Sequence, residues 1–137
     1  SAAIRIVVGE STVVDSNATY RLLETSHPPV YYVPPDDTDL TAIQPATQKT
    51  FCEWKGVATY FDLVLPDRRI RNAAWTYRSP SKKYAEIKDY LAFYPSKMDA
   101  CFVNDERVES QEGDFYGGWI TSQVVGPFKG APGTHRW

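Results

Sequence analysis

The fold is decided by residues 56–77, which read GVATYFDLVLPDRRIRNAAWTY. Residues two apart in an extended chain share a face. One face of a strand over residues 56–65 would therefore carry Val57, Thr59, Phe61, Leu63 and Leu65. Pro66 to Arg69 is typical of a turn, and residues 70–77 are expected to return as the partner strand of a hairpin.

Other strand-like segments lie on both sides of this hairpin. Residues 4–15 are typical of a hairpin with a glycine turn, and residues 19–25, 50–54 and 99–103 are each strand-like. Residues 30–33 lie between two Pro-Pro pairs, and proline cannot donate to a strand ladder. This short strand is therefore expected at a sheet edge.

One short α-helix is predicted at about residues 80–91. Ser79 suits the N-cap and Pro80 the first helical position. Tyr84, Ile87 and Leu91 follow at spacings that form one apolar face of about three turns.

About eight short strands and one helix predict a mainly β fold, either an antiparallel two-sheet, tent-like sandwich or an open barrel. The 137 residues match the commonest size of a single domain. Six of the eight glycines fall in residues 113–137, beside aromatic residues such as Trp119 and Phe128. We expect these residues to form a C-terminal extension that docks on the body of the domain.

Composition argues against several functions. The formal net charge is −2, without the basic excess typical of duplex binding, so no nucleic-acid partner is expected. No apolar run reaches the ~20 residues of a membrane span, and the first residues do not resemble a secretory signal. A cytoplasmic protein is therefore expected. Cys52 and Cys101 lie far apart and only two histidines are present, so neither a metal nor another cofactor is expected.

Glu24 and Lys55 are the candidate catalytic residues. If residues 21–25 are extended, Glu24 shares a face with Tyr20 and Leu22 and could serve as a general base; alternatively it pairs with a cation such as Arg21 or Lys55. Lys55 precedes Gly56 at the join of two strands. It could hold a phosphate or carboxylate, or act as a nucleophile, or simply be exposed in a hairpin turn.

Trp75 and Tyr77 share a face with the small Ala73 in an extended chain. Small and large side chains in alternation can shape a cavity wall with polar tips pointing inward, but ordinary core packing needs the same residues. Asp36, Asp37 and Asp39 could hold Mg²⁺ for nucleotidyl chemistry, although acidic residues are also typical of a helix start. Both alternatives stay open at each place.

Four motifs, in this order, resemble those of a known family. They are Arg-x-Leu-Glu-Thr-x-x-Pro-Pro-x-Tyr-Tyr (21–32), Cys-x-Trp-Lys-Gly-x-Ala-x-Tyr (52–60), Asn-Ala-Ala-Trp-x-Tyr (72–77) and Leu-Ala-Phe-Tyr (91–94). The family is catalogued as domain of unknown function 427, and some members carry the label nucleotidyltransferase. The resemblance implies a compact, tent-like β domain without an established activity. The residues where the motifs match, and hence the candidate ligand-binding residues, are Arg21, Glu24, Tyr32, Lys55, Trp75 and Tyr77.

These observations favour a small-molecule pocket walled by Tyr32, Trp75 and Tyr77, with polar anchors from Glu24, Lys55 and Arg21. Whether it also catalyses a reaction stays open. A non-enzymatic module that binds a protein partner or a second copy is the first alternative, and a nucleotidyltransferase is the second.

Overall fold

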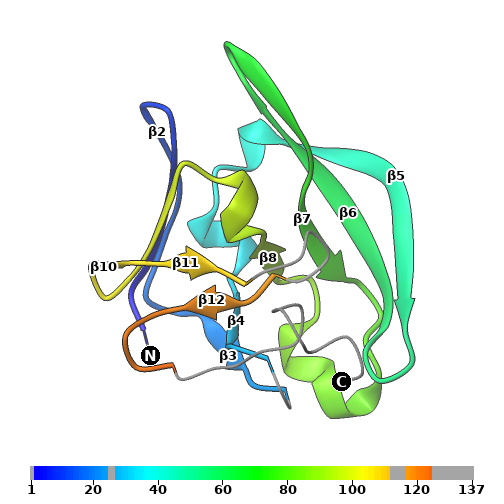
Figure 1. Cartoon of the computed structure of the whole chain (residues 1–137). Coiled ribbons are helices and arrows are strands. Elements are labelled where there is room, and N and C mark those ends of the chain that lie inside the picture. The colour runs from blue at the N-terminus through cyan, green and yellow to red at the C-terminus, as the bar shows by residue number, and fades with distance from the viewer. Residues whose placement is uncertain (1, 25–26, 112–116, 125–137) are drawn as a thin grey trace.

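The computed structural model describes residues 2–24, 27–111 and 117–124. Within these ranges the chain forms two four-stranded sheets and two two-stranded ribbons, all antiparallel, and the sheets do not close into a barrel. The expected mainly β architecture is confirmed. The two large sheets form the two sides of the molecule, and one ribbon lies below them in Figure 1.

The first sheet has the order β10-β9-β1-β2. Its strands are β1 (Ile4–Val8), β2 (Ser11–Ser16), β9 (Ala100–Val103) and β10 (Glu106–Arg107). The predicted hairpin at residues 4–15 forms β1 and β2, with Gly9 at a positive φ of 58° in the turn. The predicted strand at residues 99–103 becomes β9, which pairs with β1.

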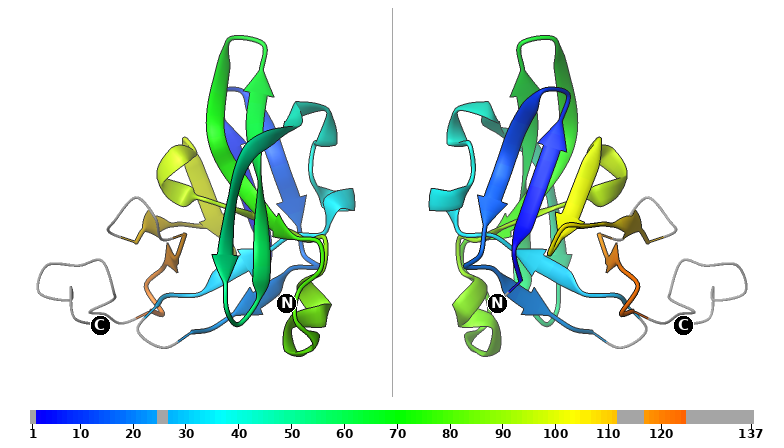
Figure 2. Two further views of the ribbon diagram at one scale, coloured as in Figure 1. Left: turned by 90° about the vertical axis from the view of Figure 1, so that its right-hand side faces the viewer. Right: turned by 90° about the vertical axis from the view of Figure 1, so that its left-hand side faces the viewer.

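The second sheet has the order β5-β6-β7-β8 and contains the decisive hairpin. Its strands are β5 (Ile43–Cys52), β6 (Gly56–Leu65), β7 (Arg68–Tyr77) and β8 (Leu91–Phe93). The turn between β6 and β7 extends past the end of the first sheet (Figure 2). β5 begins earlier than the predicted residue 50 and includes Pro45, which is tolerated because β5 is an edge strand whose register shifts there.

The expected alternation along β6 holds in one half of the strand. Phe61 and Leu63 face the main core, whereas Val57 at the other end is 49% exposed. There the opposite face is buried, because Ala58 and Tyr60 pack into a second cluster. One end of β6 therefore packs one face into the main core, and the other end packs the opposite face into the second core.

The main core lies between the large sheets, and the second core is aromatic. Fully buried aliphatic side chains such as Ile4, Ile6 and Leu63 belong to the first. The second gathers residues from β4 (Val30–Tyr32), β6, β7, β8, the residue after β8 and the 3₁₀ helix before it: Tyr32, Ala58, Tyr60, Trp75, Tyr77, Ile87, Ala92 and Tyr94.

The predicted α-helix at about residues 80–91 is wrong. Only residues Lys82–Ile87 are helical; they form a 3₁₀ helix, η3, with a non-helical Tyr84 (φ −110°, ψ 21°) inside it. Ser81, at the N-cap, makes no side-chain cap and instead donates from Oγ to the Trp54 carbonyl. Asp89 donates its N–H to the Tyr77 carbonyl (3.0 Å). These hydrogen bonds to neighbouring segments take the place of the i to i−4 bonds of an α-helix. The chain then continues into β8.

Three more 3₁₀ turns complete the connections: η1 (Pro35–Asp37), η2 (Leu40–Ala42) and η4 (Pro95–Lys97). In the described ranges no helix is long and apolar enough to cross a membrane.

The described part of the C-terminal extension packs on the body. Residues 117–124 include β12 (Trp119–Ile120), which pairs with β11 (Glu109–Ser110). Trp119 is fully buried, donates its backbone N–H to the Pro29 carbonyl (2.8 Å) and contacts Tyr31 edge-on at 5.4 Å between ring centroids. The remainder of the predicted extension, residues 113–116 and 125–137, lies outside the described residues.

Candidate functional site

A pocket of about 300 Å³ opens beside the aromatic core. Its lining comes mainly from the second sheet and from β4 (Val30–Tyr32), which pairs with β3 (Tyr20–Leu22) in one of the two-stranded ribbons. Six Phe, Tyr or Trp side chains line it: Tyr32, Phe51, Tyr60, Trp75, Tyr77 and Tyr94. The predicted wall residues Tyr32, Trp75 and Tyr77 therefore meet in one pocket, as do two of the three predicted charged anchors, Glu24 and Lys55.

The aromatic rings hold one another in defined orientations. Trp75 lies 4.6 Å from Tyr94 and meets Tyr32 edge-on at 6.4 Å, measured between ring centroids. Tyr94 also stacks on Tyr60 at 6.5 Å. Such pairs stabilise beyond their buried area, so the rings hold one another in place in the wall.

Hydroxyl groups supply the polar part of this wall. Thr50 Oγ1 lies 3.2 Å from the Tyr60 hydroxyl, which in turn lies 3.3 Å from the Tyr94 hydroxyl. Three hydroxyls carry three hydrogens, and the two contacts use only two. One O–H of this chain therefore stays available to donate to a ligand.

The tyrosine hydroxyls are neutral donors and acceptors. Burial raises the pKa of Tyr32 and of Tyr77 well above the ordinary value, and burial together with the Tyr60 hydroxyl does the same for the pKa of Tyr94. These groups consequently stay protonated across the physiological range and can hydrogen-bond a ligand without carrying charge.

Lys55 and Glu24 form an ion pair at the pocket. Lys55 Nζ donates to Glu24 Oε1 at 2.7 Å, and Lys55 is only 7% exposed. The ammonium also lies 5.9 Å from the ring centroids of Tyr77 and Tyr84. The alternative of an exposed turn lysine is thus wrong. Glu24 lines the pocket and pairs with a cation, Lys55, as its second alternative held.

Glu24 lies two residues after Leu22, the last residue of β3, and both side chains lie on the pocket side of the ribbon. Leu22 packs against the aromatic core, as the predicted alternation requires. Arg21 has the opposite orientation: it pairs with Tyr31 across the ribbon and lines a different cavity. The structure therefore does not bring Arg21 to Glu24 and Lys55.

Several residues of the pocket were not anticipated from the sequence. Tyr60 and Tyr94 end two of the family motifs, and Tyr60 shares a face of β6 with Ala58, so alternation could have indicated it. His27 and Gln111 line the same pocket and contact each other, His27 Nδ1 to Gln111 Nε2, at 3.1 Å. Gly117 approaches from the extension; a Cβ there would collide with Trp75. No local pattern indicates such a long-range approach.

The three aspartates of residues 36–39 lie in or beside 3₁₀ turns, and Asp39 is the N-cap of η2. Asp37 Oδ2 accepts from Ser16 Oγ (2.6 Å), and Asp39 Oδ1 accepts from the Thr41 N–H (3.2 Å) and hydroxyl (2.6 Å). Asp36 lies in η1, at the start of which acidic residues are common. In the part of the chain that the structure describes, no three His, Cys, Asp or Glu side chains form a group that could hold a metal ion.

Cys101 does not provide an activated thiol. Cys101 is buried in the main core, and burial raises its pKa to about 12. Cys52 is half-buried and lines the pocket. The arrangement as a whole is suited to binding: rigid aromatic walls, neutral hydroxyl donors and one ion pair.

Comparison with known proteins places this site within a family. A search of curated proteins finds no match. A family model described as Domain of unknown function (DUF427) matches residues 1–104, about three quarters of the chain, which include the six aromatic wall residues, Glu24 and Lys55. The match confirms the resemblance, and the chain therefore belongs to the DUF427 family.

Proposed function

We propose that this protein binds a small organic molecule in the aromatic pocket, with Lys55 and Glu24 as its polar anchors. The observation that carries the proposal is the 2.7 Å ion pair, with a nearly buried ammonium, in a pocket walled by aromatic rings. Ligand sites commonly combine apolar walls with few convergent polar groups and have volumes of about 300–1,000 Å³. At about 300 Å³ this pocket is suited to a small ligand.

The stability of the fold alone gives little reason for the ion pair between Lys55 and Glu24. Removing an ammonium from water costs free energy that its ion pair only partly recovers, and apolar residues of similar volume often stabilise a protein as well. The Glu24 side chain is 34% exposed, and only Oε1 carries a hydrogen bond among the described residues. Oε2 is thus left as an acceptor for a ligand donor.

The pocket also favours particular ligand features. A flat ring can lie against Trp75 or Tyr94. A hydrogen-bond acceptor on the ligand can receive the free O–H of the chain formed by Thr50, Tyr60 and Tyr94. A planar molecule with both a donor and an acceptor is therefore the expected class.

A thermal-shift screen of small metabolites tests the proposal. A ligand at 100 times its Kd stabilises by about 2.7 kcal/mol, which raises Tm by roughly 5–10 °C in a domain of this size. We expect Lys55→Met to weaken the binding of a hit at least about tenfold, because it removes a charged contact. Lys49→Met is the matched control, since Lys49 is exposed on β5.

Lys55→Met should itself remain folded, because the partly exposed Glu24 can be hydrated once its partner is lost. Circular dichroism and the Tm of the unliganded variant check this. A hit that binds equally well to folded Lys55→Met would exclude the pair as its anchor. A broad screen without any saturable hit would count against the pocket itself.

An interaction with a protein partner, or with a second copy of the chain, is the second candidate. Three large apolar side chains are exposed at the β5–β6 turn: Phe51 (74%), Trp54 (64%) and Val57 (49%). Phe51 and Val57 are direct cross-strand partners, so they form one patch. Sedimentation equilibrium of wild type and Val57→Ser separates this candidate, because Val57 lies outside the pocket lining and self-association that requires the patch is lost in the variant.

A further inference from the structure

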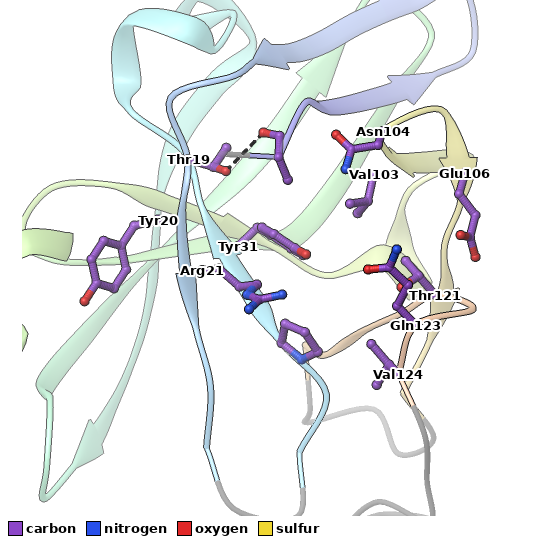
Figure 3. Close-up of a pocket in the computed structure, with 12 residues that line it drawn as sticks. Thr19, Tyr20, Arg21, Tyr31, Val103, Asn104, Glu106, Thr121, Gln123 and Val124 are labelled. Carbon is purple, nitrogen blue, oxygen red and sulfur yellow. Dashed lines mark hydrogen bonds between the residues drawn. The ribbon is translucent and has the colours of Figure 1, made fainter.

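A second, larger cavity of about 570 Å³ lies on the other face of the β3–β4 ribbon. In this antiparallel pair Tyr20 faces Tyr32 and Arg21 faces Tyr31. Since neighbours along a strand point to opposite faces, Tyr32 enters the aromatic pocket while Tyr31 and Arg21 line the second cavity. Residues 121–124 and the turn at Asn104 complete this cavity (Figure 3).

Arg21 brings a positive charge to this cavity. Its guanidinium points into the space between the ribbon and residues 121–124 (Figure 3). Among the described residues it makes no ion pair or hydrogen bond, whereas Arg68 and Arg69 each pair with an aspartate. A guanidinium offers five N–H donors in a planar fork that matches a carboxylate.

Two neutral groups that line the same cavity as Arg21 can also donate. Asn104 has a left-handed backbone (φ 48°), and its Oδ1 accepts the Ala3 N–H at 2.8 Å, so its NH₂ group is left to donate. Tyr31 is only 5% exposed, and Trp119 holds its ring edge-on. The Tyr31 hydroxyl points into the cavity (Figure 3) and has no hydrogen-bond partner among the described residues.

Glu106 brings a negative charge to the same cavity. Its carboxylate accepts the N–H of Ser122 (2.5 Å) and the Ser122 hydroxyl (2.7 Å), and these bonds hold the pKa of Glu106 below its ordinary value. The group is therefore ionised at neutral pH. Glu106 and Arg21 do not form an ion pair with each other, although both line the cavity.

We propose that this cavity binds a small zwitterion of the amino-acid type. Its carboxylate lies on Arg21, with the Asn104 amide and the Tyr31 hydroxyl as further donors, and its ammonium faces Glu106. Two opposite charges that line one cavity without pairing complement a ligand that carries both a carboxylate and an ammonium. The inference is independent of the proposed function, because the two sites lie on opposite faces of the ribbon.

The two charges that line the cavity also disfavour ligands that carry only negative charge. Arg21 and Glu106 are the charged side chains that line the cavity among the described residues, and their charges cancel. A doubly charged phosphate would place excess negative charge near Glu106, which costs free energy. A single carboxylate compensated by an ammonium avoids this cost.

The experiment is an NMR titration of the ¹⁵N-labelled full chain with each of the twenty common L-amino acids. For each amino acid that binds, the deaminated carboxylic acid and the decarboxylated amine are titrated in parallel, and inorganic phosphate serves as the simple anion. We expect at least one amino acid to shift the amide signals of residues around the cavity in a saturable way. Both analogues and phosphate should bind at least about tenfold more weakly.

Three variants locate the binding. Arg21→Met should weaken the binding of the amino acid at least about tenfold, while Arg71→Met, at a side chain that is 77% exposed and outside the cavity, should leave Kd unchanged. Glu106→Gln keeps the size of the side chain and should weaken binding of the amino acid but not of its deaminated analogue. Arg21 is exposed, so its replacement should not unfold the chain, and the dispersion of the ¹⁵N spectrum verifies this.

The outcomes that overturn the proposal are equally specific. No saturable shift with any amino acid would show that the cavity does not bind this class. Equal affinity for the amino acid and its deaminated analogue would contradict the role of Glu106. Unchanged affinity in Arg21→Met would show that the amino acid binds elsewhere.

Discussion

Replacing Trp119 with Ala is expected to lower the free energy of unfolding by about 3–5 kcal/mol, as for other fully buried aromatic residues. Trp119 is 0% exposed and belongs to the main core, although it lies in the C-terminal extension. Its indole contacts Tyr31 and donates from Nε1 to the Phe93 carbonyl at 3.3 Å. The variant loses this packing and leaves a buried carbonyl without its donor.

Urea denaturation measured by circular dichroism checks this result. Trp54→Ala is the matched control, because it deletes the same side chain where it is 64% exposed. We expect the control to change stability by no more than about 0.5 kcal/mol. Since small domains are stable by only about 5–15 kcal/mol, the loss in Trp119→Ala is a large part of the total. A loss below about 1 kcal/mol would contradict the assignment of Trp119 to the core.

The second large effect is expected at Asp62, a buried carboxylate in the decisive hairpin. Asp62 is 4% exposed; its Oδ1 accepts the backbone N–H of Asn72 (2.9 Å) and its Oδ2 accepts from Arg69 Nε (3.0 Å). Asn72 has a left-handed backbone (φ 51°) where the β6–β7 register shifts. The Asp62 side chain thus satisfies the amide that the bulge removes from the ladder.

Asp62→Ala should therefore lower the free energy of unfolding by about 2–3 kcal/mol, the cost of an unsatisfied buried donor together with a lost charged contact. Asp62→Asn should cost less, because its amide oxygen can still accept the Asn72 N–H. Asp67→Ala, in the exposed turn of the same hairpin, should stay within about 0.5 kcal/mol. Equal losses in the Ala and Asn variants would show that the Asn72 bond contributes little.

The same site predicts a dependence on pH. The Asn72 N–H, and then Arg69, hold the pKa of Asp62 below its ordinary value, against the opposing effect of burial. A lowered native pKa adds stability above the unfolded pKa of about 3.9, and this stability is lost as the pH falls through the native pKa. The stability difference between wild type and Asp62→Asn should thus be constant above about pH 5 and shrink below about pH 4. Denaturation curves from pH 2.5 to 7 measure it, and a difference that stays constant to pH 2.5 would contradict the ion pair.

Much of the aromatic pocket could be predicted because its residues follow simple strand alternation. Trp75 and Tyr77 are two apart on β7, and Glu24 is two from Leu22, so each pair shares a face wherever the chain is extended. By the same rule, Tyr31 and Tyr32 point to opposite faces of the ribbon, and so do Arg21 and Leu22. Arg21, which lies opposite Tyr31, would therefore have been placed on the face away from the aromatic pocket. Local alternation indicates which residues point the same way, but it does not indicate what they meet.

Residues 80–91 show where local signals fail. The spacing of Tyr84, Ile87 and Leu91 suits a helix, yet Ile87 is buried in the aromatic core and Leu91 lies in β8. Ser81 and Asp89 donate their backbone N–H groups to Lys55 and Tyr77, in neighbouring segments. A periodic pattern of apolar residues indicates only that these side chains are buried. Strand pairing with a distant segment can bury them as well as a helix can.

By itself, the sequence determined the mainly β architecture, the central hairpin and the family, because strand alternation and turn residues act over a few neighbouring positions. The tertiary structure alone decided that Lys55 and Glu24 pair, that Arg21 belongs to a separate cavity and that Trp119 completes the core. Each of these depends on how separate strands register and on which faces meet. Those choices depend on the packing of the whole chain, and no short segment encodes them.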